Sequence, residues 1–200
     1  MEKKTKRQSG DVRRNQIKSA VKEIIFYDGL QNLTTKNIAR KVGISEGTVF
    51  KHYVSKKAII DDILKDVQTE LVEPLQKIAM ENIGASQRLE KHICYHLDYL
   101  ARNEGITILL FTEASYQNDA GLKKMLDETY HTLEDSFARI VRDGIADGIW
   151  DNEVSVDDLS KLYMGIPLAM NIELLLQGSK VNNLDYCNKM QVLLRRILKK

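Results

Sequence analysis

The chain has 200 residues, 43% of them hydrophobic and 29% charged, a composition typical of a globular protein with a substantial core, which excludes disordered and fibrous classes. No apolar run reaches the roughly 18 to 20 residues of a membrane span, and the polar start of the chain is unlike a secretory signal, so we expect a cytoplasmic protein without membrane contact. Residues 1–57 hold 14 Lys and Arg against 5 Asp and Glu, whereas residues 58–200 hold 16 against 23, which favours a polyanion-binding head on a body that is not drawn to polyanions.

Helical periodicity begins close to the N-terminus. Apolar residues at helical spacing predict a first helix over residues 11–28, and Gly29 follows where a left-handed residue is wanted. Thr34 is expected to cap a short second helix that Gly43 ends, and Ser45 to cap a third helix after a brief turn. Two short helices joined by a glycine-containing turn, with a longer helix before them, indicate a helix-turn-helix.

The third helix carries many polar and basic groups for its length. In a helix-turn-helix this helix enters the DNA major groove, so its exposed face must reach phosphates and base edges. Val49 is left to pack inward, and Gly47 lets the backbone approach the duplex closely. The groups expected to face DNA are Ser45, Glu46, Thr48, Lys51 and His52. The alternative is that they form the solvated face of a small helical hairpin.

A fourth helix is predicted to start after Ser55 and to run from Lys56 toward Asn82. Lys56 and Lys57 in its first turn oppose the helix dipole, which is tolerable if a phosphate lies between them and the free amides. Residues 1–10 form a basic arm that we expect to be flexible without DNA. The arm could reach along the minor groove or only add salt-dependent affinity.

These segments resemble a known family. The stretch from Leu33 to Ile60, LTTKNIARKVGISEGTVFKHYVSKKAII, looks like the helix-turn-helix of TetR/AcrR-type transcriptional regulators, and IKSAVKEIIFYDG, from Ile17 to Gly29, is similar to the family's first helix. The resemblance implies a homodimer of about nine helices per subunit, with a C-terminal domain that binds a small molecule. It implies DNA contacts by Thr35, Lys36, Ser45, Glu46, Gly47, Thr48, Lys51, His52 and Lys56.

Three positions depart from the family's usual pattern. Phe50 stands where tyrosine is common, so a phosphate-contacting hydroxyl is missing there. Tyr53 stands where phenylalanine is usual and could supply a hydroxyl nearby, so both residues are kept among the DNA-contacting set. Lys57 replaces an acidic residue and makes this edge more basic. The detailed map of contacts therefore depends on the structure.

The rest of the chain is predicted from periodicity. A helix capped by Ser86, a short helix over residues 106–116 and a long helix over residues 119–146 are expected, with short loops that favour antiparallel neighbours. We therefore expect an all-α chain, with a DNA-binding domain at residues 11–57 and a regulatory and dimerisation domain at residues 58–200.

The stretch LYMGIPLAMNIELLL, from Leu162 to Leu176, contains only Asn171 and Glu173 as strongly polar residues. A helix that is apolar all round must be covered on both sides, and Pro167 should kink or interrupt it. With the last helix, from Leu184 to Lys200, it is predicted to form a two-fold, four-helix dimer interface. The interface residues expected are Ile166, Met170, Leu174, Met190, Leu193, Leu194 and Ile197. A monomer that buries the segment centrally is the alternative.

A small-molecule effector is expected among the middle helices of each subunit. The residues predicted to line its site are Phe111, Tyr130, Phe137, Tyr163, Met164 and Met170, with Tyr95, His96, Glu113 or Asn171 as polar anchors. This mixture suggests a largely apolar ligand with one polar end. Such a stripe can equally be plain core.

Enzymatic and metal-binding signals are weak. His92 and His96 stand at i, i+4 with Asp98 near, but no Glu follows the first His as a zinc peptidase requires, so the alternative is two partly exposed histidines beside a core stripe. Cys94 and Cys187 give neither a disulfide framework nor metal-ligand spacing and are expected to be ordinary buried thiols. We expect no catalytic residues, no metal and no cofactor.

The sequence thus predicts a ligand-responsive transcriptional regulator. Its partners would be double-stranded DNA, read as a pseudo-palindrome by a homodimer, and an effector that releases a repressor from its operator. One alternative is a DNA-bound organising protein of the same fold that is controlled by a protein partner. Another is a helical enzyme whose basic head is incidental.

Overall fold

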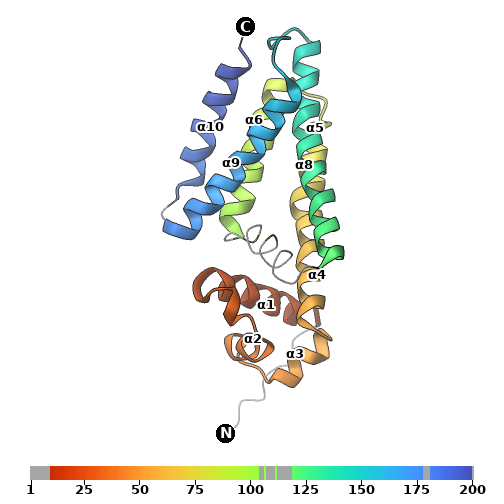
Figure 1. Ribbon diagram of the computed structural model, residues 1–200, viewed down its shortest axis with the longest axis vertical. Helices are drawn as coiled ribbons and strands as arrows, with labels where there is room; N and C mark the ends of the chain where they lie inside the picture. The colour runs from red at the N-terminus through yellow and green to blue at the C-terminus, as the bar shows by residue number, and fades with distance from the viewer. Residues whose placement is uncertain (1–9, 104–105, 107–110, 112–118, 178–180, 200) are drawn as a thin grey trace. The chain divides into compact units, whose positions relative to one another are not determined.

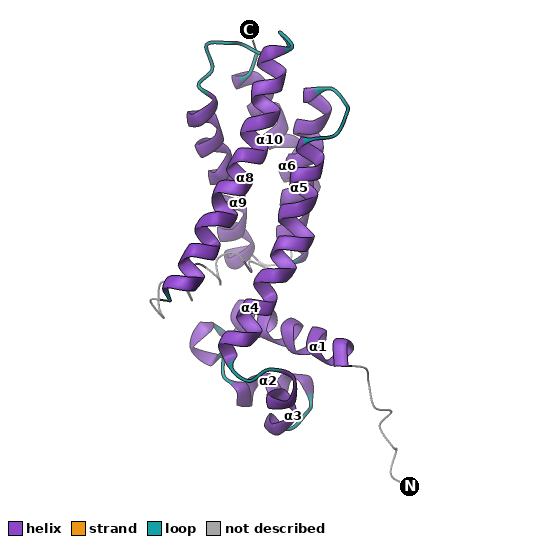
Figure 2. Cartoon of the chain, turned by 90° about the vertical axis from the view of Figure 1, so that its right-hand side faces the viewer, coloured by secondary structure: helices purple, strands orange, loops and turns teal. Residues whose placement is uncertain are grey.

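Helices account for all the regular secondary structure of the described residues, 10–103, 106, 111, 119–177 and 181–199 of the computed structural model (Figure 1 and Figure 2). The predicted all-α fold is confirmed. The chain divides into two compact units, Met1–Leu64 and Lys65–Lys200, referred to below as the N-terminal and C-terminal units.

The N-terminal unit is built from short helices around a small core. In order, its elements are α1 (Gly10–Glu23), the π-turn η1 (Ile24–Asp28), the 3₁₀ turn η2 (Leu30–Asn32), α2 (Thr35–Val42), α3 (Glu46–His52) and the first part of α4 (Lys56–Val67). Ile17, Ile38, Val49, Ile59 and Ile63 are each completely buried. One apolar stripe from each helix therefore meets the others in a single core.

The predicted start and stop signals of the short helices are confirmed. The Thr34 hydroxyl accepts from the Asn37 amide at 3.1 Å and caps α2, and Gly43 ends that helix in the left-handed region with φ 73°. Gly29 also has a positive φ, 85°, but its ψ of 156° leaves the left-handed helical region, because α1 ends through a π-turn rather than a simple cap.

The division between the units lies inside α4 rather than at its start. Ile59, Ile60 and Ile63 in the first turns of α4 are buried, and Asp62 accepts a hydrogen bond from Tyr53 at 2.6 Å. These contacts assign the first half of α4 to the N-terminal unit, beyond the boundary at residue 57 that the sequence suggested.

The C-terminal unit is a bundle of longer helices. Its elements are η3 (Gln68–Val72), a π-turn, followed by α5 (Glu73–Ala79), α6 (Ala85–Arg102), α8 (Ala120–Ala146), α9 (Val156–Gln177) and α10 (Asn183–Ile197). Within this unit α6 packs against α8, α9 and α10 (Figure 1). The unit's core therefore centres on α6.

Helix boundaries in the C-terminal unit confirm some predictions and correct others. Asp119 caps α8 by accepting from the Leu122 amide at 3.0 Å, as expected. Ser86 was expected to cap a helix, but Gly84 holds that position and Ser86 lies inside the first turn of α6, because the backbone there needs no side-chain cap. The helix expected over residues 106–116 lies largely outside the described residues.

Of the two effects predicted for Pro167, a kink or an interruption, the interruption does not occur. The helix continues through it to Gln177, and Pro167 is buried within the unit. Proline removes one intrahelical donor, yet the Asn171 side-chain amide donates to the Pro167 carbonyl at 3.0 Å. This bond adds a second donor to the Pro167 carbonyl, but it does not replace the donor that proline lacks.

By length and a mean hydropathy of 1.2, α9 is the one helix among the described residues that could cross a membrane. The sequence holds no uninterrupted apolar run long enough to span a membrane. A hydropathy average over 18 residues allows up to two charged residues, and α9 meets that looser criterion. One such helix is weak evidence, because a core helix of a bundle meets the same criterion and 39% of this window is buried inside the chain.

A tight packing contact closes the end of α8. Trp150, 5% exposed, lies against Gly144 so closely that a β-carbon there would come within 2.2 Å of the indole ring. The turn between them passes through Gly148, with φ 71°, a conformation that favours glycine. The Asp151 amide then donates to the carbonyl of Leu198, beyond α10, at 3.0 Å.

Candidate DNA-binding site and regulatory core

The helix-turn-helix is held by side-chain hydrogen bonds at the start of its second short helix. The Ser45 hydroxyl accepts from the Thr48 amide at 3.2 Å and lies 2.8 Å from the Thr48 hydroxyl. The Thr35 hydroxyl, at the start of α2, donates to the Glu46 carboxylate in α3. These bonds connect α2 and α3 at the ends that are expected to approach DNA. The polar side chains at the start of α3 are therefore held in position without DNA.

The residues predicted to contact DNA are accessible, with one exception. The exposed members are Lys36, Ser45, Glu46, Gly47, Phe50 and Lys51, and the half-buried ones are Thr35, Thr48, His52 and Lys56. Val49 is completely buried, as predicted for the inward position. One face of α3 therefore presents hydroxyl, carboxylate, ammonium and imidazole groups together, as base-edge and phosphate contacts require.

Tyr53 is the exception, and the expectation that its hydroxyl could replace the one missing at Phe50 is not supported. Tyr53 is only 4% exposed, and its hydroxyl donates to Asp62 at 2.6 Å. The Arg14 guanidinium lies over its ring, 5.3 Å from the centroid. A tyrosine enclosed in this way stabilises the fold of the unit and cannot reach a phosphate.

Asp62 is the centre of this small polar cluster. Burial disfavours its charged form, but the hydrogen bond from Tyr53 and the charges of Lys18 and Arg14 outweigh burial, so the pKa of Asp62 lies below its ordinary value. The Lys18 ammonium is 3.6 Å from the Asp62 carboxylate. The cluster joins α1, α3 and α4 within the N-terminal unit.

Two details of the DNA-facing surface were not anticipated. Val54, just after α3, is 84% exposed, and Phe50 is 48% exposed; exposed apolar groups beside basic ones can contact thymine methyl groups. Lys57 lies 3.6 Å from Asp61, so the additional positive charge predicted there is partly compensated.

In the C-terminal unit, aromatic and imidazole rings from three helices meet in the core. The Phe137 ring of α8 and the Tyr163 ring of α9 stack with centroids 4.0 Å apart and planes 2° from parallel. The Tyr163 hydroxyl lies 2.9 Å from Nδ1 of His96 and 3.1 Å from Nδ1 of His92, both on α6. The two histidines were expected to be partly exposed, but they are 0% and 3% exposed because this face of α6 is covered by α8 and α9.

The geometry fixes the protonation of this triad. A hydroxyl can donate to one ring nitrogen and accept from the other, so Tyr163 is satisfied when both rings are neutral. Burial lowers the pKa of His96 to about 4, and burial together with the charge of His96 lowers the pKa of His92 to about 3. Burial also raises the pKa of Tyr163. All three side chains are therefore uncharged at neutral pH.

Two buried polar atoms, one on α6 and one on α9, have no hydrogen-bond partner among the described residues. They are Nε2 of His92 and Oδ1 of Asn171, and Asn171 is only 1% exposed. A buried group without a partner costs about 1–3 kcal/mol. Such atoms can be satisfied by a polar group that enters the core.

The structure brings three of the predicted effector-binding residues together, His96, Phe137 and Tyr163, and His92 joins them although it was predicted only as a weak metal ligand. Met170 and Asn171 are buried elsewhere along α9, and Met164 is half-buried. The remaining predicted residues lie differently. The Tyr95 hydroxyl donates to the Glu70 carbonyl at 2.7 Å, Tyr130 is half-buried with its ring edge toward His131, Phe111 is 45% exposed, and Glu113 lies outside the described residues.

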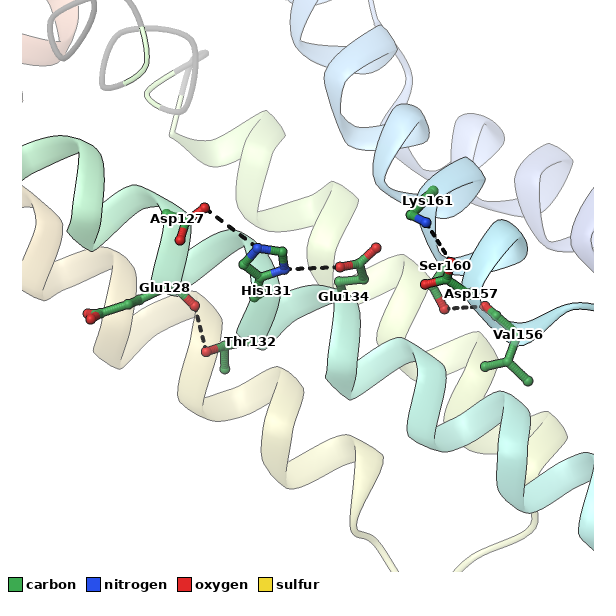
Figure 3. Close-up of polar contacts among 9 residues, drawn as sticks. All are labelled: Asp127, Glu128, His131, Thr132, Glu134, Val156, Asp157, Ser160 and Lys161. Atoms are coloured by element: carbon green, nitrogen blue, oxygen red, sulfur yellow. Dashed lines mark hydrogen bonds and ion pairs between the residues drawn. The ribbon is translucent and has the colours of Figure 1, made fainter.

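Figure 3 shows ion pairs of α8 and α9 together with hydrogen bonds from the Thr132 and Ser160 hydroxyls to carbonyls of their own helices. The His131 ring lies 3.5 Å from Asp127 and 3.2 Å from Glu134, and Lys161 pairs with Asp157 at 2.5 Å (Figure 3). Exposed pairs of this kind contribute little to stability. In the described part of the chain, no group of three or more His, Cys, Asp or Glu is arranged to hold a metal ion.

The apolar surface of α9 and α10 differs from the predicted interface in its exact residues. Met170, Leu174 and Leu194 are buried within the unit, Ile166 and Met190 are half-buried, and only Leu193 and Ile197 are exposed. The exposed apolar residues of the two helices are Leu162, Leu168, Ile172, Leu175 and Leu176 on α9 and Leu184, Val192, Leu193 and Ile197 on α10. We call this set the α9–α10 face. The sequence showed that α9 is apolar on both sides but not which side faces inward.

Cys94 of α6 and Cys187 of α10 form a disulfide, with their α-carbons 5.3 Å apart. The expectation of two ordinary thiols is therefore wrong. The sequence separation of 93 residues carries no signal of pairing, which arises only because α6 and α10 pack antiparallel.

Comparison with known proteins identifies the first unit. Residues 18–63 match the family model of bacterial regulatory proteins, tetR family, a span that includes the helix-turn-helix and the start of α4. The N-terminal unit is a TetR-family DNA-binding domain. The resemblance seen in the sequence is thereby confirmed.

Relatives of this TetR-type chain extend beyond the DNA-binding domain. The nucleoid occlusion factor SlmA of Sodalis glossinidius is 24% identical over 132 residues, 66% of this chain and 67% of the relative. SlmA of Vibrio cholerae matches over the same length with the same identity.

Solved structures show the same fold over nearly the whole chain. The ketosteroid transcriptional regulator KstR2 of Mycobacterium tuberculosis covers 98% of each chain with a TM-score of 0.80 and 15% identity. FadR of Bacillus subtilis, solved in complex with stearoyl-CoA, covers 90% of this chain and 96% of its own with a TM-score of 0.70 and 21% identity. The fold of the C-terminal unit is therefore shared with these regulators.

Proposed function

We propose that this TetR-family DNA-binding regulator is a repressor that binds a pseudo-palindromic operator as a homodimer and is released by a small, largely apolar effector with one polar end. The observation that carries the proposal is the α3 surface. Its hydroxyl, carboxylate and basic groups are exposed on a pre-fixed helix within a basic unit, while the apolar Val49 packs inward.

Dimerisation is supported by the α9–α10 face. Isolated exposed apolar side chains are common on monomers, but exposed large apolar side chains gathered on the last two helices favour an interaction surface there. A second copy of the chain presents the same set, which suits a two-fold interface. A two-fold dimer would place two α3 helices on half-sites one or more helical turns apart.

Effector binding is supported by the buried, uncharged polar centre of the C-terminal unit. Nε2 of His92 has no hydrogen-bond partner among the described residues and lies beside the stacked Phe137 and Tyr163 rings, and Oδ1 of Asn171, further along α9, also has none. The fold is shared with a regulator solved with stearoyl-CoA and with a ketosteroid regulator, so acyl and steroid compounds are the first probes to use.

Release from DNA follows from a difference in affinity between two dimer geometries. An effector shifts the equilibrium only as far as it prefers the geometry that does not fit the operator. Moving the populations from 1:99 to 99:1 requires about 5.5 kcal/mol of such preference. Neutral hydrogen-bonding side chains inside an apolar core can supply part of this difference in affinity, because a hydrogen bond to the effector's polar end is stronger in a low-dielectric site.

A gel shift tests the proposal directly. The full chain should bind a palindromic fragment from beside its own gene in preference to random duplex at about 0.15 M salt, and a long-chain acyl-CoA, a free fatty acid or a steroid should release it. Equal affinity for palindromic and random DNA would contradict regulation at an operator.

A second function, a DNA-bound organising protein controlled by a protein partner, is favoured by the similarity to SlmA and by a surface groove. The groove, about 600 Å³, lies between α5 and α8 and is lined by Gln76, Ala79, Met80, Thr132, Asp135, Ser136, Arg139, Arg142 and Asp143. None of the predicted effector-binding residues lines it. A protein controlled by a partner would stay bound to its operator in the presence of every apolar compound tested. The Arg139→Glu variant of such a protein would lose its cellular effect without any weakening of DNA binding.

Cellular placement follows from the proposed role. The relatives are DNA-binding regulators, and a protein that reads an operator must share the compartment of the DNA. We therefore propose that the chain acts in the cytoplasm. No reaction is assigned to it, and the comparisons concern regulators rather than enzymes.

A further inference from the structure

Helices α6 and α10 pack against one another antiparallel, and polar pairs at the two ends of the contact show their register. Toward the C-terminal end of α6, Asp98 accepts from the Asn183 side-chain amide at 3.0 Å. Toward its N-terminal end, Glu90 pairs with Arg195 at 2.9 Å. Residues that lie opposite one another between these pairs therefore face each other.

Cys94 and Cys187 occupy that position. Their α-carbon separation of 5.3 Å lies in the range where a disulfide forms without backbone movement. The Gln191 side-chain amide lies 2.9 Å from the Cys94 sulfur and 3.2 Å from the Cys187 sulfur, where it donates weak hydrogen bonds to both. Cys94 is half-buried, whereas Cys187 is 2% exposed, so an oxidant reaches Cys94 first.

We propose that Cys94 and Cys187 are a redox-active pair that closes a cross-link between α6 and α10 in the presence of a peroxide and opens when thiol reductants predominate. A reduced resting state rests on the proposed function, because the compartment that holds bacterial DNA keeps thiols reduced. The register then makes disulfide formation the expected result of oxidation.

The chemistry needs only the two thiols and hydrogen peroxide. The Cys94 thiolate attacks one peroxide oxygen, so that an S–O bond forms, the O–O bond breaks and hydroxide leaves as water after protonation. The Cys187 sulfur then attacks the Cys94 sulfenic acid, the S–S bond forms, the S–O bond breaks and a second water leaves. Two thiols lose two electrons and two protons, and one peroxide becomes two waters. A dithiol reverses the cross-link by exchange.

The cross-link acts on half of the α9–α10 face. Leu184, Val192, Leu193 and Ile197 lie on α10, so a covalent tie of α10 to α6 keeps them presented even when noncovalent contacts open. It also closes a long chain loop, which restricts the unfolded state.

Thiol counting and thermal unfolding of the full chain test the pair. Protein prepared with reductant should show two titratable thiols, and both should disappear after treatment with hydrogen peroxide while the chain loses two hydrogens in mass. It should run as a monomer on a denaturing gel without reductant. The melting temperature should rise by roughly 5–15 °C and return after dithiothreitol.

Single-cysteine variants provide the matched controls. Cys94→Ala and Cys187→Ala should each remove the effect of peroxide on the melting temperature, and circular dichroism checks that each variant is folded. If either variant fails to fold, the wild-type thiol count and mass still decide the matter. Intermolecular cross-links, sulfinic acid as the main product, or an unchanged melting temperature after both thiols are lost would each overturn the proposal. A failed operator gel shift with a normal thiol result would instead count against the proposed function alone.

Discussion

The side chains of α3 and its neighbours divide into those proposed to contact the duplex and those that hold them in place. Lys51 is exposed on α3, and Lys56 is half-buried in the first turn of α4. A cation at a helix start is suited to a backbone phosphate, whereas one in the middle of the recognition helix is placed to reach a base edge. This difference gives the two lysines distinct expected roles.

Lys56→Ala should weaken binding to operator and random DNA alike and reduce the salt dependence by about one ion. Lys51→Ala should cost about 1–3 kcal/mol mainly on the operator, because it removes a base contact. Lys124→Ala removes an exposed lysine of α8 and serves as the control. Equal losses on operator and random DNA for both α3 and α4 variants would show that the roles are wrongly assigned.

Tyr53→Phe separates a structural role from a phosphate contact. Removing the hydroxyl leaves the partly buried Asp62 without its 2.6 Å donor, so unfolding of the N-terminal unit should become easier by about 1–3 kcal/mol. Operator affinity measured well below the melting temperature should stay within about two-fold of wild type. A large loss of affinity by the folded variant would restore Tyr53 to the DNA-contacting set.

Among the helices, α9 has two apolar sides, one buried in the core of its unit and the other exposed to solvent. One side carries Tyr163, Met170 and Asn171 into the core, and the other exposes Leu168 and Ile172. A helix of this kind is stable in water only when its outer side is covered. The α9–α10 face is therefore where association of subunits should be tested.

Ile172→Asp should convert the proposed dimer into a monomer. The two-fold axis places the new carboxylates at one interface, where an unpaired buried charge weakens association by on the order of 100-fold or more. Analytical ultracentrifugation at micromolar concentration measures this. Ile149→Asp is a matched control, since Ile149 is 47% exposed, against 46% for Ile172, but lies outside the face. Dissociation by both variants alike, or by neither, would place the interface elsewhere.

Local sequence signals identified elements more reliably than they identified contacts. The caps at Thr34, Ser45 and Asp119 and the stop at Gly43 could be predicted because they depend on a few adjacent residues. The inward side of α9 and the pairing of Cys94 with Cys187 could not, since both depend on which helices meet. The burial of Tyr53 followed from Asp62, a neighbour that only folding brings near.

At the scale of the molecule, the two units carry different kinds of chemistry. The basic residues gather in the TetR-type N-terminal unit, where charges face solvent and salt will screen them. The C-terminal unit instead hides neutral polar groups in its core. The stability of this unit should therefore depend on pH through buried imidazoles rather than surface charges.

The stability of the C-terminal unit should fall as the pH is lowered below 6.5. The pKa values of His92 and His96 are lowered from 6.5 to about 3 and about 4 in the folded chain, so the unfolded chain binds more protons in this window. Their stabilising contribution is complete above pH 6.5 and is lost toward pH 4, by roughly 1.4 kcal/mol per pH unit for each fully titrating histidine.

Thermal unfolding from pH 7.5 to 4.5 measures this effect. His96→Gln, which cannot gain a proton, should make the dependence clearly shallower and leave only the part that comes from His92. A wild-type melting temperature that stays constant down to pH 4.5 would mean that the two imidazoles are not enclosed as described.

The indole ring packed on Gly144 has a practical consequence for such measurements. Trp150 is the chain's only tryptophan, and it lies in the C-terminal unit, so its fluorescence emission reports the melting of that unit and is silent about the DNA-reading head. Comparing emission with the far-ultraviolet dichroism of all helices will therefore reveal whether the two units unfold together or in separate steps, without any label attached to the chain.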